Sequence, residues 1–289
     1  MHLLADRGDS GAYDMACIIP FDYHVHSNYS ADAQTSMEDM CRSAVAAGVP
    51  EIGFTEHYDL HPDEKPRDWF RLEPWLAELD RCRTEFSGQL QIRAGIEIGE
   101  PHLFQAEVEA MLARAPFDYA IGSLHWVGRI ATFNVAFFQR PAEEAFRLYY
   151  EELERMTRSG GFDVLGHLDF PVRTAFDVYH GYDPRSHETL IRPVLQNCIE
   201  RGIALDVNTS AMRKQAHVLL PGLEILRWYV EMGGERVTLG SDAHRPEHVA
   251  AYLDVALDTI KAAGLRYLTR FERREPRLIP LPNVIRDCF

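Results

Sequence analysis

The chain has 289 residues, of which 46% are hydrophobic, and this is enough for one large α/β domain of the barrel type. Its formal net charge of −14 argues against a surface that holds a nucleic-acid backbone, and no apolar stretch approaches the roughly 18–20 residues that a membrane helix needs. The five cysteines are odd in number and include no C-x-x-C pair, which argues against a disulfide framework or a thiolate zinc site and favours a reducing, cytoplasmic location.

Residues 1–16 are predicted to be an N-terminal extension, because they are largely polar and lack the pattern of a signal peptide. Seven short apolar segments with the character of strands follow, at residues 17–19, 52–54, 90–92, 119–121, 164–165, 204–207 and 237–239. Apolar spacing and capping residues predict helices between and after them, at residues 36–47, 74–86, 103–113, 141–159, 187–201, 221–232 and 246–263.

The connections between the predicted strands exceed the dozen or so residues that a parallel crossover requires, so the sheet is expected to be parallel. Ser36 is expected to cap the first helix, with Gly48 just after its end. The charge-dense segment 270–277 is expected to be a solvated tail.

Side chains with metal-binding atoms follow six of the seven predicted strands. In chain order they are His24 with His26, Glu56 with His57, Glu97, His125, His167, and Asp242 with His244, whereas the sixth strand runs into Asn208. The carboxyl ends of barrel strands meet at one face, where catalytic groups gather. Imidazoles and carboxylates collected there predict a site for several divalent metal ions.

No single member of this set is diagnostic. His24 and His26 are two residues apart and therefore lie on the same side of a strand. Glu97 stands in G-I-E-I-G, where a buried salt bridge and a bridging metal ligand are both open interpretations. One histidine at such a position is more often a structural core residue than a ligand, so the prediction depends on their joint occurrence at strand ends.

The order of the motifs resembles a known family. H-x-H, T-E-H, G-I-E, G-S-L-H, G-H-L-D and G-S-D-A-H, spread over residues 21–252, are similar to the motifs of the PHP (polymerase and histidinol phosphatase) metallophosphoesterases. Residues 30–33 (S-A-D-A) and 206–214 (D-V-N-T-S-A-M-R-K) resemble segments of the histidinol-phosphatase branch. The resemblance implies a catalytic domain over residues 17–289, folded as a distorted (β/α)7 TIM-like barrel with parallel strands.

The resemblance also implies three divalent metal ions (Zn, Mn or Fe) and a ligand set for each. His24, His26, Glu97 and Asp242 would hold the first; Glu97 would bridge to the second, together with His125 and His167; Asp32, His57 and His244 would hold the third. Arg173 and Arg213 match arginines that bind the substrate phosphate, and the forked donor pair of arginine fits phosphate oxygens.

These features imply hydrolysis of a phosphate monoester, with a metal-bridging hydroxide as nucleophile and Glu97, Asp242 and His244 as catalytic residues. The first substrate implied is L-histidinol phosphate, of histidine biosynthesis, whose amino and imidazole groups could meet Glu56, Glu100 or Asp169. The alternatives are another small phosphate, such as a nucleotide or sugar phosphate, and a non-catalytic metal-binding scaffold domain. The complete ligand set argues against the scaffold.

Overall fold

The computed structural model describes residues 19–282, so the predicted extension over residues 1–16 lies outside the described residues. Its main sheet contains only parallel pairs and runs in the order β1-β2-β4-β5-β8-β9-β10, with β3 also paired to β4. The strands are β1 (Asp22–Val25), β2 (Glu51–Phe54), β3 (His57–Tyr58), β4 (Gln91–Gly99), β5 (Tyr119–Ser123), β8 (Val164–Leu165), β9 (Ala204–Asn208) and β10 (Val237–Gly240).

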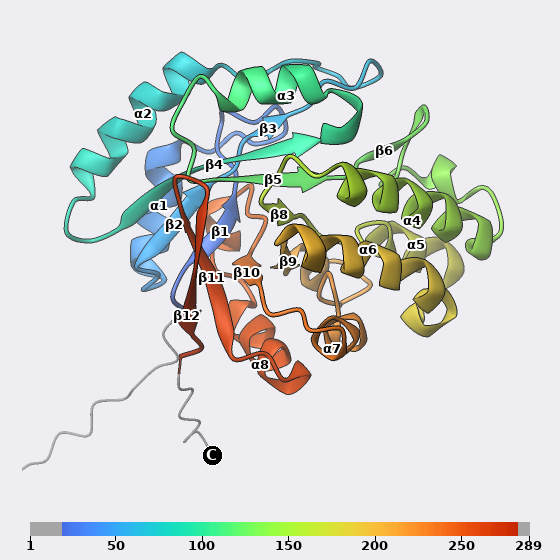
Figure 1. Ribbon diagram of the computed structural model, residues 1–289. Coiled ribbons are helices and arrows are strands. Elements are labelled where there is room, and N and C mark those ends of the chain that lie inside the picture. Colours follow the sequence, from blue (N-terminus) through green and yellow to red (C-terminus); the bar gives the residue numbers. More distant parts are fainter. Residues whose placement is uncertain (1–18, 283–289) are drawn as a thin grey trace, which may run out of the picture.

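The two outer strands of this sheet, β1 and β10, meet and nearly close it. The amide of His26 donates to the carbonyl of Ala243 at 2.8 Å, and the amide of Ala243 donates to the carbonyl of His24 at 3.3 Å. The strands therefore surround a common axis, with the helices outside them (Figure 1). The predicted parallel (β/α)7 barrel is confirmed.

The helices cover the outside of the barrel (Figure 1). They are α1 (Met37–Ala46), α2 (Leu72–Glu85), α3 (Gln105–Leu112), α4 (Ala142–Ser159), α5 (Val172–Tyr179), α6 (Glu188–Arg201), α7 (Leu223–Glu231) and α8 (Leu253–Ala263). Ser36 caps α1 as predicted, since its Oγ accepts from the amide of Asp39 at 3.1 Å. None of the helices within residues 19–282 is long and apolar enough to cross a membrane.

Two helix predictions need correction. Helix α5 was not expected, although it carries Arg173. The helix expected over 246–263 begins only at Leu253, because Ala250 and Tyr252 have positive φ values of 60° and 63° that interrupt a right-handed helix. Residues Pro246–His248 instead form the short 3-10 helix η5.

The first strand of the described residues is β1, which pairs with β2 through Asp22 and Ile52, so His24 lies inside the strand. Of the strand expected at 17–19, residues 17 and 18 lie outside the described residues and Ile19 is not in a strand. The neighbouring residue Tyr23 is buried and stacks on the ring of Tyr119, with ring centroids 4.9 Å apart. The alternation places His24 on the opposite side of the strand from Tyr23. Polar residues in a fully buried strand concealed it from a search for apolar runs.

The segment expected to be a solvated tail is part of a hairpin. Strands β11 (Tyr267–Glu272) and β12 (Glu275–Pro280) pair antiparallel and lie across the amino ends of the barrel strands (Figure 1). Arg270 forms an ion pair of 2.9 Å with buried Glu51 at the start of β2, and Arg274 pairs at 2.8 Å with Asp163, just before β8. Two charges of this segment are therefore matched to carboxylates at the end of the barrel opposite the strand carboxyl ends. The other charged residues of the segment are exposed, as expected: Glu272, Arg273, Glu275 and Arg277.

Replacing Phe271 with alanine should lower the free energy of unfolding by about 3 kcal/mol, because a buried phenyl ring is lost. Phe271 is 2% exposed and its ring lies 6.0 Å from that of Tyr119. Chemical denaturation measures this change. Leu278→Ala is the matched control, because Leu278 lies in the same hairpin but is 39% exposed. Equal effects of both substitutions would contradict a packing role for the hairpin.

Candidate metal centre

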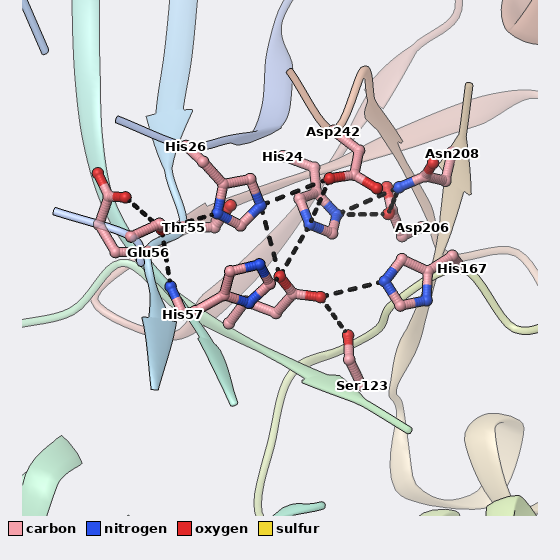
Figure 2. A network of polar contacts seen from close by, with 12 residues as sticks. His24, His26, Thr55, Glu56, His57, Ser123, His167, Asp206, Asn208 and Asp242 are labelled. Atoms are coloured by element: carbon pink, nitrogen blue, oxygen red, sulfur yellow. Dashed lines mark hydrogen bonds and ion pairs between the residues drawn. The ribbon is translucent and has the colours of Figure 1, made fainter. Parts of the chain in front are cut away.

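The predicted ligands come together at the carboxyl ends of the strands. His24 lies in β1 and His26 just after it, while His57 begins β3 and Glu97 lies in β4. His125, His167, Asp242 and His244 lie in the loops that follow β5, β8 and β10. Figure 2 shows His24, His26, His57, His167 and Asp242 arranged around one central carboxylate.

That central carboxylate is Glu97, whose side chain is 1% exposed. Its Oε2 lies 3.3 Å from Nε2 of His24, 3.4 Å from Nε2 of His26 and 3.0 Å from Nδ1 of His57. Its Oε1 lies 3.1 Å from Nε2 of His167 and 3.5 Å from Nε2 of His125, and accepts a hydrogen bond from Ser123. The two oxygens therefore face two different groups of histidines, as a bridging ligand would require.

Two buried carboxylates, Glu97 on β4 and Asp242 after β10, carry the negative charge of this centre. Burial opposes ionisation of Glu97, but the imidazoles of His24 and His57 hold its pKa well below the usual range. Burial likewise opposes ionisation of Asp242, while His24 and His244 lower its pKa. Both groups are thus anionic at neutral pH and suited to bind cations.

Three of the histidines, His24, His26 and His244, are held by contacts at the same ring nitrogen. Their Nδ1 atoms are occupied: His24 by Asp206 at 2.8 Å, His26 by Ser30 at 3.0 Å, and His244 by the carbonyl of Asp242 at 3.1 Å. Such contacts hold the tautomer and ring orientation of a metal-binding histidine. Nε2 is consequently the atom that each of these rings presents to the centre.

The third predicted group lies at the mouth of the site. Oδ2 of Asp32 is 3.1 Å from Nε2 of His244 and 3.6 Å from Nε2 of His57, and the Asp32 side chain is 58% exposed. The ring of His26 stacks between this group and the interior, with its centroid 4.2 Å from that of His244. The structure thus brings all nine predicted ligands into one continuous cluster.

The donor set fits divalent metal ions. Nε2 of His24, Nε2 of His26 and Oε2 of Glu97 are buried and have no hydrogen-bond partner within residues 19–282. A buried polar atom without a partner costs about 1–3 kcal/mol, which a bound cation would offset. Four groups of three residues have ligand atoms within 4.8 Å of one another, among them His24, His26 and Asp242. Mixed imidazole and carboxylate ligands suit Zn, Mn or Fe.

A cavity of about 550 Å³ opens above these ligands and is lined by Asp32, His57, Glu97, His125, His167, Arg173, Arg213, Asp242 and His244, among others. This volume is typical of a small-molecule site. The guanidinium of Arg173 lies 4.1 Å from the centroid of the Phe170 ring, and Arg213 donates to the carbonyls of Ser241 and Asp242 at 2.8 and 3.1 Å. Neither arginine pairs with a carboxylate of the described residues, and Nη1 of Arg213 is buried without a hydrogen-bond partner.

Glu56, Glu100 and Asp169 do not line the cavity. The Glu56 carboxylate accepts from Ser27 and Ser30 at 2.6 Å each, and Glu100 accepts from the amides of His125 and Trp126 at 2.6 and 2.9 Å. Asp169 is 3% exposed. All three lie behind the cavity wall, which contradicts the expectation that they meet the organic part of a substrate.

Other functional residues were missed from the sequence. Asp206 orients His24, and Asn208 donates to Asp206 at 3.0 Å (Figure 2). The Oδ1 of Asn208 accepts from the amide of Ser210. A signal for these two exists, since residues 206 and 208 share one face of β9. Asp59 and Glu64 line the cavity from a loop after β3, where no local pattern marks them.

Comparison with known proteins agrees with the geometry. A family model described as "PHP domain" matches residues 22–210. A relative from Deinococcus radiodurans named "Probable histidinol-phosphatase" is 31% identical over 264 residues, which is 88% of this chain and 98% of that protein. The histidinol-phosphatase of Lactococcus lactis is 29% identical over 258 residues, or 86% of this chain and 93% of that protein.

A solved structure has the same fold. Histidinol phosphate phosphatase from Lactococcus lactis, in complex with Zn, L-histidinol and phosphate, matches with a TM-score of 0.81 and 26% identity, covering 89% of this chain and 98% of that one. The matched region of the family model exceeds half of this chain. This chain therefore belongs to the PHP domain family.

Proposed function

We propose that this protein is a metal-dependent phosphatase that hydrolyses L-histidinol phosphate. The observation that carries the proposal is one cavity lined both by Glu97 with its surrounding imidazoles and by the guanidinium groups of Arg173 and Arg213. Cations held by the imidazoles and carboxylates, together with the two guanidinium groups, would supply the positive charge that a phosphate monoester needs. The relatives named histidinol-phosphatase, similar over most of their length, support the choice of substrate.

The proposed ligands are those grouped above: His24, His26, Glu97 and Asp242; Glu97 with His125 and His167; and Asp32, His57 and His244. Three divalent ions held there would lower the pKa of water and offset charge on the phosphoryl oxygens. Arg173 and Arg213 have donors free to bind the same oxygens and to stabilise the charge that develops on them. The Arg213 contacts to the loop of Asp242 fix its position relative to the ligands.

His244 is proposed as a ligand rather than as the acid for the leaving group. Its Nε2 faces Asp32 at 3.1 Å, and its Nδ1 lies 3.1 Å from the carbonyl of Asp242. Both ring nitrogens are therefore engaged, and neither is available to protonate a leaving oxygen. Glu97 and Asp242 are proposed to act in catalysis through the ions that they hold.

Glu64 is proposed to bind the amino group of the substrate. It lies in the cavity wall, and its Oε2 accepts from the indole of Trp126 at 2.8 Å. Trp126 stacks on His61, with ring centroids 4.6 Å apart and planes 7° from parallel. The loop after β3 is thus held against strand β6 (Trp126–Val127), and the position of the carboxylate is fixed. An anionic group in this wall suits a leaving group that carries a primary amine.

Replacing Glu64 with glutamine is expected to raise KM for L-histidinol phosphate about tenfold, since hydrogen bonds to charged groups contribute about 1.5–3 kcal/mol and 1.4 kcal/mol is tenfold. Glutamine retains an oxygen for the Trp126 bond, so the loop stays in place. Steady-state rates with p-nitrophenyl phosphate, which has no amine, should change less than twofold (about the error of the measurement). A similar loss with both substrates would contradict the assignment.

The proposed function is tested by phosphate release from L-histidinol phosphate beside a panel of nucleotide and sugar monophosphates. A kcat/KM for L-histidinol phosphate at least about a hundredfold above the panel is expected, equivalent to about 2.7 kcal/mol of selective binding. Weak and equal turnover of the whole panel would reject this substrate and favour a different small phosphate.

A further inference from the structure

We propose that Asp59 is a positioning residue that holds two of the metal groups at once, by orienting both His57 and His125. The proposal rests on the metal centre of the proposed function. It adds a role for a carboxylate that is absent from the predicted ligand set. Asp59 directly follows β3 and lines the cavity.

Each carboxylate oxygen of Asp59 faces a different histidine. Oδ2 lies 3.6 Å from Nδ1 of His57, and Oδ1 lies 3.6 Å from Nδ1 of His125. The opposite nitrogens point to the proposed ligands: Nε2 of His57 lies 3.6 Å from Asp32, and Nε2 of His125 lies 3.5 Å from Glu97. Asp59 therefore lies behind the ring of His125, on the side away from Glu97. At His57 it shares Nδ1 with Glu97, whose Oε2 lies 3.0 Å from that nitrogen, and Nε2 remains directed at Asp32.

The surrounding chain leaves space for this carboxylate. Strands β3 and β4 pair with His57 opposite Glu97 and Tyr58 opposite Ile98, which brings Asp59 next to Gly99. A Cβ atom at Gly99 would lie 2.3 Å from Oδ1 of Asp59, closer than any Cβ approaches another atom. The φ angle of Gly99 is not among the positive values, so backbone conformation does not require glycine there. The close approach of the Asp59 side chain is instead what favours glycine at position 99.

The Asp59 carboxylate has few polar contacts besides these two histidines. Its side chain is 16% exposed, and Oδ1 is buried with no hydrogen-bond partner within residues 19–282. No arginine or lysine of the described residues forms an ion pair with it. The two imidazoles are thus its ion-pair partners among the described residues, and a protonated Nδ1 on each ring would leave Nε2 free for a metal.

A single substitution at Asp59 should therefore weaken two metal sites together. His57 belongs to the proposed third group and His125 to the second. The first group is oriented independently, because His24 depends on Asp206 and His26 on Ser30. Partners that orient ligating histidines typically contribute about 10–100-fold in metal affinity.

The test is metal content of the full-length protein after reconstitution with Zn²⁺ or Mn²⁺ and dialysis against graded chelator. In the Asp59→Asn protein, two of the three ions per chain are expected to dissociate at a chelator concentration about 10–100-fold lower than in the wild type. The third ion is expected to be retained. The metal-free forms of the variant and the wild type should unfold at the same temperature. Gly99→Ala, which displaces the carboxylate without removing it, should reproduce the pattern.

Asp63→Asn is the matched control, because Asp63 lies in the same loop but pairs with exposed Arg129 at 2.6 Å. It should bind metal like the wild type. The proposal is overturned if Asp59→Asn retains wild-type binding, loses a single ion, or loses all three together. A lowered unfolding temperature of its metal-free form would equally overturn it, by assigning Asp59 a role in stability alone.

Metal counts need no substrate, so the two proposals fail separately. A wild-type protein that binds three ions but leaves L-histidinol phosphate intact contradicts the proposed function and not the role of Asp59. A wild-type protein that binds fewer than two ions contradicts the shared role of Asp59 directly.

Discussion

Replacing Glu97 with glutamine is expected to reduce kcat/KM for phosphate release by about a thousandfold or more, because several kcal/mol of charge stabilisation by metal ions would be lost. Glu97 is buried, and its two oxygens face the histidines of two groups. Glutamine keeps the size of the side chain but places an NH2 group against imidazole nitrogens. Its carboxamide also lacks the negative charge that holds cations between the groups.

Metal analysis should show that the Glu97→Gln protein retains at most one ion per chain, since the proposed first and second sites share this residue. Glu107→Gln is a suitable control, as Glu107 lies exposed on α3. Near-normal activity with a full set of ions would show that Glu97 is a structural carboxylate and that the ligand assignment is wrong.

Replacing Arg173 with glutamine should lower kcat/KM by about a hundredfold or more, the typical cost of removing one preorganised donor to a developing anion. Arg173 extends from α5 over the Phe170 ring and has no carboxylate partner among the described residues, so its charge is available to the substrate. Metal content should stay unchanged, which separates this effect from that of Glu97→Gln.

Arg173→Lys provides a graded comparison. Lysine keeps the charge but lacks the planar fork that fits two phosphate oxygens, so only partial recovery is expected. Arg147→Gln serves as the control, because Arg147 pairs with Glu151 on the surface of α4. Loss of metal in Arg173→Gln, or unchanged kinetics, would contradict a role in binding phosphate.

The cluster of ligands could be predicted from the sequence because it depends on a local rule. His57, His125, His167 and Asp242 stand just after short apolar segments, and the parallel topology brings the ends of these segments to one face. His24, Glu97 and Asp242 lie far apart in the chain, yet the strand order and the closure of the barrel bring them into contact.

The residues behind the ligands could not be predicted in the same way. Glu64 and Asp59 belong to an irregular loop, and the position of that loop depends on the stacking of His61 on Trp126 and on the space left at Gly99. These contacts join residues from separate loops, and no periodic pattern in either segment marks them. Asp206 differs, because its spacing from Asn208 within β9 carries a signal that was overlooked.

The C-terminal hairpin shows a related limit. In the sequence Arg270 and Arg274 look like part of a solvated charged tail, because their partners, Glu51 and Asp163, are more than a hundred residues away. Charge density alone does not distinguish a solvated segment from one matched to distant carboxylates. The pairing becomes visible only when the barrel has brought the amino ends of its strands together.

The most direct test of the account is the rate of phosphate release from L-histidinol phosphate as metal-free protein is titrated with Zn²⁺ or Mn²⁺, with metal content measured in parallel. The proposed site predicts no turnover without metal, and activity that rises until three ions are bound per chain. Turnover that persists after complete removal of metal, or protein that is fully loaded with metal and inactive on this substrate, would contradict it.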